Sequence, residues 1–138
     1  MSAQLDRLKA RLEAIPKEVR EAVRPALERS GEELASRMKA LAPEDSGALK
    51  ESIQATPPGG TVPPRSIGAG DEKTAGELQT IVTAGDAKAF YARWVEFGTE
   101  KTPAHPFFFP AYRLTRERIK RRLARAIGKA VRENWNKQ

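Results

Sequence analysis

Residues 91–111 constrain the fold of this chain more than any other stretch. They consist of YARWVEFGT, a three-residue EKT spacer and PAHPFFFPA. One glycine and three prolines fix where the backbone can turn, and aromatic side chains on both sides of the turn can pack against one another. The stretch therefore predicts a rigid corner anchored by aromatic residues, a feature that serves packing or assembly.

Composition limits the remaining possibilities. The 138 residues, 31% of them charged, with a mean hydropathy of -0.60, predict a single domain over 1–138 with a small core and extended appendages. The chain has no cysteine, which excludes disulfides and thiolate metal sites. Charged residues near the amino terminus argue against a secretory signal, and no apolar stretch predicts membrane association. A net charge of +7 favours polyanions or acidic proteins as partners.

Helical periodicity dominates residues 1–42. Leucines and an isoleucine at three- and four-residue spacing predict a short first helix ending near Ile15. Pro16 can open a second helix, which the apolar stripe extends over residues 17–41. Pro25 should kink this helix, and the Ser30-Gly31 pair should loosen it.

The middle of the chain predicts short elements. Residues 43–56 are expected to form a turn and a short helix, with Asp45 or Ser46 as its cap. Residues 57–64, PPGGTVPP, are expected to be an extended, exposed Pro/Gly loop. Such a loop either becomes ordered on a partner or is a tolerated flexible insertion, and the residues do not decide between the two.

Residues 65–105 predict a small antiparallel β ribbon followed by the aromatic corner. The expected strands are 65–70 and 77–84, and two strands alone are marginally stable, so the ribbon must lie on the helices or on a neighbour. Residues 90–97 fit either a strand or a short helix. We favour a short helix that ends at Gly98 in a left-handed cap.

The last segment, 106–138, predicts a long amphipathic helix opened by Pro106, with an apolar stripe from Tyr112 to Ala130. From residue 111 onward it carries ten basic and two acidic residues, an excess larger than the net charge of the chain. The face opposite the stripe could bind phosphates, bind an acidic protein partner, or be solvated. Its residues are Arg118, Arg121, Arg122, Arg125, Lys129 and Arg132. Together these elements predict the α+β class.

Nothing in the sequence predicts catalysis. The one histidine, His105, lies between Pro103 and Pro106, without a second histidine or a cysteine to share a metal. No serine lies in a nucleophile-elbow context. Gly68-Ala69-Gly70 is too short for a phosphate-binding loop. We therefore expect no enzyme activity, no cofactor and no metal.

Three blocks carry a family resemblance: APEDSGAL over 42–49 with SI at 52–53, YARWVEFGT over 91–99, and PAHPFFFPA over 103–111. In their order and spacing the chain resembles the small neck or tail-completion proteins of long-tailed phages and phage-derived particles, the relatives of gene product ten of a lambdoid phage. The resemblance implies a structural virion subunit in a hexameric ring between the head connector and the tail tube. The particle would be assembled in the bacterial cytoplasm, and genomic DNA would pass through the ring without sequence recognition.

The resemblance also implies roles for the corner residues. Glu96 would cap a backbone amide or meet an arginine, and Gly98 would allow the chain to reverse. The predicted structural corner or subunit interface comprises Tyr91, Trp94, Glu96, Phe97, Gly98, Thr99, Pro106, Phe107 and Pro110. The alternative function is a basic nucleic-acid-binding module that uses the last helix.

Overall fold

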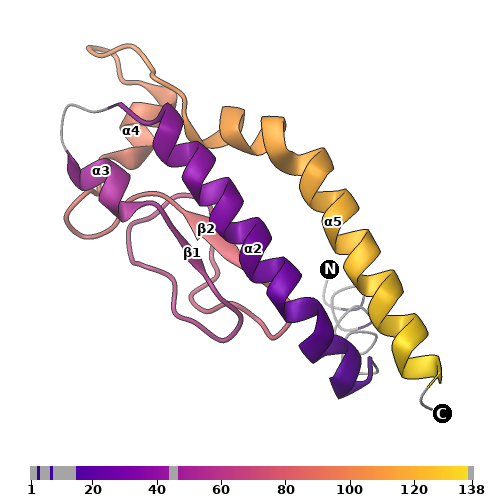
Figure 1. The fold of residues 1–138 in the computed structure, drawn as a ribbon. Helices are drawn as coiled ribbons and strands as arrows, with labels where there is room; N and C mark the ends of the chain where they lie inside the picture. The colour runs from indigo at the N-terminus through magenta and orange to yellow at the C-terminus, as the bar shows by residue number, and fades with distance from the viewer. Residues whose placement is uncertain (1–2, 4–6, 8–14, 44–46, 137–138) are drawn as a thin grey trace.

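The computed structural model describes Ala3, Arg7 and residues 15–43 and 47–136. The predicted helix before Ile15 and the predicted caps Asp45 and Ser46 lie outside the described residues. The α+β prediction is confirmed (Figure 1). The elements are α2 Lys17–Leu41, α3 Gly47–Ser52, β1 Gln54–Thr56, β2 Ile81–Thr83, α4 Ala92–Phe97 and α5 Phe108–Asn136.

Helix α2 has the predicted bounds. The carbonyl of Pro16 accepts hydrogen bonds from the N–H groups of Val19 and Arg20, at 3.0 and 3.1 Å, so Pro16 precedes the helix instead of being its first residue. At the other end Pro43 disfavours helical backbone at Ala42, which has φ -69° and ψ 142°. Pro25 lies inside α2 without ending it.

The Ser30-Gly31 pair is a buried packing site, and α2 continues through it without a break. A Cβ atom on Gly31 would lie 2.5 Å from Cγ2 of Thr80 and 3.1 Å from Cβ of Ala55. Glycine therefore lets α2 approach the sheet to a distance that no other residue allows. Ser30 is buried toward α5, so α2 lies between the sheet and α5 (Figure 1).

One of the two expected strands forms: β2 lies within the predicted strand 77–84, but its partner is β1 and not the predicted strand 65–70. β1 and β2 are antiparallel, with Ala55 opposite Val82. The predicted strand 65–70 contributes only an isolated bridge between Ile67 and Ala84. Gly68 has φ 112°, and its backbone passes so close to the Val82 carbonyl and the Phe108 ring that a side chain there would clash. This approach ends the pairing after one residue.

The Pro/Gly loop forms no helix or strand, but it makes hydrogen bonds and apolar contacts with other residues of the same chain. Val62 is buried with Ala75 and Ile81 in a small apolar cluster. Its N–H donates to the carbonyl of Lys73 at 2.9 Å. The expectation that residues 57–64 are exposed holds only in part, because Pro58 and Val62 are buried and the loop pairs with residues 73–75 of the same chain.

The main core lies at the corner end of the molecule. Met38 from α2, Ile53 after α3, and Phe107 before α5 are each 0 or 1% exposed and belong to one cluster. A second, smaller cluster joins α2 to the far end of α5 through Val19, Val23 and Ala130. Helices α2 and α5 thus contact each other in two apolar clusters, of which the cluster at the corner is the larger.

Candidate functional site

The corner is organised by one buried carboxylate. Glu96 lies on α4 and is 4% exposed. Its Oε1 accepts hydrogen bonds from the backbone N–H groups of Phe107 and Phe108, both at 2.8 Å, and its Oε2 accepts one from Phe109 at 3.1 Å. Of the two roles predicted for Glu96, the backbone cap is the one observed. A negative charge at this position also interacts favourably with the dipole of α5.

Glu96 and Pro110 together leave no unpaired backbone N–H group at the start of α5. A helix leaves its first N–H groups without intrahelical partners. Three of these donate to Glu96, and the next residue is Pro110, which has no N–H. The first intrahelical bond then runs from Ala111 to the carbonyl of Phe107 at 3.4 Å. With the Phe107 carbonyl as the first acceptor, α5 begins at Phe108, two residues later than predicted.

Gly98 ends α4 in a conformation that suits only glycine. Its φ is 78° and its ψ is 174°, so the predicted positive φ is observed but the left-handed cap is not. This region is essentially restricted to glycine. A Cβ atom there would lie 2.8 Å from the N of Ala104 and 3.1 Å from the carbonyl of Thr102. The chain can therefore fold back against itself only at a glycine.

Residues 99–106 form an exposed projection, visible as the orange loop beyond α4 (Figure 1). Thr99 holds its base: its Oγ1 accepts from the N–H of Thr102 at 3.0 Å and from that of Lys101 at 3.3 Å. The N–H of His105 donates to the Val95 carbonyl at 2.8 Å. Pro106 is exposed where the chain returns to the core.

The predicted interface residues divide into a buried group and an exposed group. Phe107 is fully buried, and Tyr91 is half-buried at the start of α4. Trp94 and Phe97 are 50% and 61% exposed. The sequence analysis did not single out Phe109, which is 41% exposed and lies 5.9 Å from Phe97 between ring centroids. Two helices thus contribute one exposed aromatic surface.

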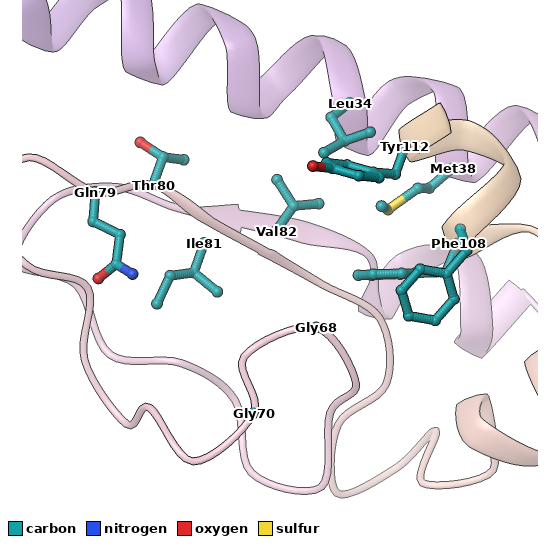
Figure 2. Close-up of a pocket in the computed structure, with 11 residues that line it drawn as sticks. Leu34, Met38, Gly68, Gly70, Gln79, Thr80, Ile81, Val82, Phe108 and Tyr112 are labelled. Atoms are coloured by element: carbon teal, nitrogen blue, oxygen red, sulfur yellow. The ribbon is translucent and has the colours of Figure 1, made fainter. Parts of the chain in front are cut away.

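This surface continues into a groove of about 520 Å³ between α2, β2 and the start of α5 (Figure 2). Figure 2 shows Leu34, Val82 and Tyr112 gathered at one end of the groove beside Met38 and Phe108. A second pocket of about 410 Å³ is lined in part by Trp94, Pro103 and His105. The aromatic corner is therefore flanked by two apolar hollows.

The predicted basic face is divided differently from the expectation. Arg122 is turned into the α2–α5 contact, where its Nη2 donates to Oε2 of Glu33 at 2.8 Å and its Nη1 to Oγ of Ser30 at 3.1 Å. Its side chain is 16% exposed. The remaining predicted cations are exposed. They are Arg118, Arg121, Arg125, Lys129 and Arg132.

The Arg122 contact shifts the titration of its partner. The hydrogen bond from Arg122 lowers the pKa of Glu33 below its ordinary value of 4.5; partial burial opposes the shift, and the charges of Arg122, Arg118 and Arg37 add to it. Sequence analysis missed Glu33 and Ser30 as functional partners of α5. The available signal was a serine in the middle of a predicted helix, where it has no local role.

Within the part of the chain that the structure describes, no group of three or more histidine, cysteine or acidic residues could hold a metal ion. His105 is exposed and contributes a backbone contact to the corner. None of the described helices has the length and apolar character needed to cross a bilayer. The corner can therefore present an exposed aromatic surface to a partner and hold the start of α5 in place.

A comparison with protein families matches residues 6–98, more than half of the chain, to the model described as "HK97-gp10_like: Bacteriophage HK97-gp10, putative tail-component". The match includes α2, the sheet and α4 and ends at Gly98, before the projection and α5. Comparisons with curated proteins and with solved structures gave no significant match.

Proposed function

The chain belongs to the HK97 gp10-like family of bacteriophage tail components, and from this membership we propose that it is a ring-forming tail-completion subunit of the head-tail neck. Membership makes it a structural, tail-associated virion protein. In the proposal, a hexameric ring surrounds the DNA channel, contacts the tail tube on one face and the head connector on the other, and ends growth of the tube. Closed rings use two different surfaces of each subunit.

The exposed aromatic surface is the observation that supports this proposal. In a chain with 31% charged residues, Trp94, Phe97 and Phe109 are between 41% and 61% exposed at one end of the molecule. Exposed apolar patches mark interaction sites. Burying the remaining exposed half of each ring contributes about 1 kcal/mol per residue. Such a surface suits contact with a neighbouring subunit.

The corner also holds this surface in a fixed shape. Glu96 ties α4 to the start of α5, and so fixes Phe97 relative to Phe109. Gly98 and Thr99 fix the base of the projection between them. Side chains that are ordered before association lose less entropy on binding. A rigid corner therefore favours a defined contact between identical subunits over non-specific aggregation.

The test is the oligomeric state of the purified full chain, measured by sedimentation and by negative-stain electron microscopy. We expect a closed six-fold ring. The double variant Phe97→Ser/Phe109→Ser should weaken association by about tenfold or more and keep the wild-type circular dichroism. The matched control is Trp135→Ser, at a residue that is 75% exposed and lies about 39 Å from Phe109 along α5. A persistent monomer, or equal loss in both variants, would contradict the proposal.

The second candidate is a basic nucleic-acid-binding module, which the exposed cations of α5 favour. The two functions differ in affinity. A neck subunit needs only weak, non-specific contact with DNA, whereas a dedicated module binds tightly. A nanomolar Kd for duplex DNA at physiological salt would favour the module over the neck subunit.

A further inference from the structure

We infer that Arg118, Arg121, Arg125, Lys129 and Arg132 form a phosphate-binding row for duplex DNA on the outer flank of α5. The inference specifies the DNA-contacting face of the subunit, and its placement in a channel rests on the proposed function. The chemistry of the row itself does not depend on ring formation and can be tested on the isolated chain.

The row is narrow and continuous. At about 100° per residue, its five positions fall within an arc of about 80° around α5, and they extend about 21 Å along the helix axis. All five side chains are exposed. Duplex DNA carries about one negative charge per 1.7 Å of its axis, so a row of this length faces enough phosphates for every cation to find a partner.

The row excludes negative charge. At the same angular spacing, both acidic residues of α5, Glu117 and Glu133, fall outside the arc. Arg118 and Lys129 have only loose pairs at 4.0 Å, with Glu33 and Glu133. Among the described residues, Arg121, Arg125 and Arg132 form no ion pair.

Arg122 differs from the five residues of the row because it is paired within the protein. It is the predicted basic residue that packs against α2, where Glu33 neutralises it. An Arg held by a buried hydrogen-bonded pair is unavailable to phosphate without breaking that pair. The five remaining members of the predicted basic face are exposed, so a polyanion can reach them.

The row is not part of a known base-reading motif. Arginine can pair with guanine in the major groove, but α5 lacks the features of the motifs that position side chains there. Phosphate contacts from arginine and lysine give affinity without sequence information. The structure therefore points to weak, salt-sensitive binding of any duplex.

The position of the row gives the subunit an orientation. Phe109 and Tyr112 line the groove toward β2, and the middle of the row falls about 140° to 160° around α5 from them. If the row lies against DNA, the outer flank of α5 lines the channel. The groove and the exposed aromatic surface then face away from the channel, where neighbouring subunits are available.

The experiment compares two triple variants of the full chain that remove equal charge from opposite flanks of α5. The row variant is Arg121→Gln/Arg125→Gln/Arg132→Gln, and the matched control is Arg113→Gln/Arg116→Gln/Lys120→Gln. Binding to a mixed-sequence duplex is measured by fluorescence anisotropy over a range of salt concentrations. The slope of log K against log salt is negative, and the row variant should reduce its magnitude by about 2 to 3, whereas the control should keep the wild-type slope.

Equal loss of slope in both variants would overturn the inference, because net charge and not the row would then determine binding. A wild-type slope in both variants would also overturn it, and would leave an acidic protein as the partner of the row. Sedimentation of the same proteins separates this test from the proposed function. If the row variant forms wild-type rings but loses DNA binding, the result supports the row. If the wild-type chain is a monomer but its salt dependence is still reduced in the row variant, the result contradicts the proposed ring and leaves the row intact.

Discussion

Replacing Glu96 by alanine tests whether one carboxylate holds the start of α5. The change removes the acceptor of three backbone N–H groups at 2.8, 2.8 and 3.1 Å. Phe107 and Phe108 are 0% and 6% exposed, so water cannot readily replace the carboxylate at their amides. Phe109 is partly exposed and its amide can recover a water partner.

The magnitude follows from these amides. A buried donor left without a partner costs about 1–3 kcal/mol, and two such donors with the lost helix cap give a total of about 3–5 kcal/mol. This is a large fraction of the roughly 5–15 kcal/mol that stabilises a folded domain. With a urea m value of about 2 kcal/mol/M, the midpoint should fall by about 1.5–2.5 M.

The assay is equilibrium urea unfolding followed by tryptophan fluorescence, since Trp94 lies on the same helix as Glu96. Glu96→Gln keeps one acceptor oxygen but loses the charge and turns an NH₂ group toward one amide, so it should cost about 1–2 kcal/mol. The matched control is Glu100→Ala in the exposed projection, which should change the free energy of unfolding by less than about 0.5 kcal/mol. A loss below about 1 kcal/mol for Glu96→Ala would refute the reasoning, because it would show that the amides find other partners.

Three further predictions follow from the backbone and from the α2–α5 contact. Gly98→Ala should destabilise the protein by about 2 kcal/mol or more, because φ is 78° and the new Cβ would lie 2.8 Å from the N of Ala104; an unchanged urea midpoint would contradict this. Gly31→Ala should destabilise the protein by about 1–2 kcal/mol, although alanine favours helix. The control Gly128→Ala should stabilise it by up to about 1 kcal/mol, because the new Cβ meets only the Arg132 side chain, at 3.5 Å. If thermal unfolding ranks the two variants the other way, close packing at Gly31 is refuted. Glu33→Gln should lower the free energy of unfolding by about 1–2 kcal/mol at neutral pH. Because the folded pKa of Glu33 is depressed, the difference in unfolding free energy from wild type should persist above about pH 5 and shrink as the pH falls below 4.5. A difference that does not depend on pH would refute the ion pair.

Much of the helical framework could be predicted because its signals are local. The apolar stripe and two prolines define the bounds of α2. One glycine, three prolines and the aromatic residues around them predicted the corner, and a backbone cap was one of two expected roles for the Glu96 carboxylate. Each of these features depends on residues close in sequence or on one strong conformational preference.

The remaining features depend on contacts between distant segments. β1 has three residues, too few to show an alternating pattern, and it pairs with a strand far along the chain. The burial of Arg122 could not be predicted from α5 alone, because its partners Ser30 and Glu33 lie on α2. The Pro/Gly loop likewise finds its backbone partner in Lys73.

The Arg122 contact also determines how the two long helices can move. A slide of α5 along α2 by one turn, about 5.4 Å, would carry the guanidinium past Glu33 and Ser30 and break both of its hydrogen bonds. Some protein switches work by such one-turn ratchets between packed helices. Here the slide would leave the Glu33 carboxylate without its 2.8 Å partner, so the contact favours one register of the two helices. We therefore expect α2 and α5 to shift together and not past each other.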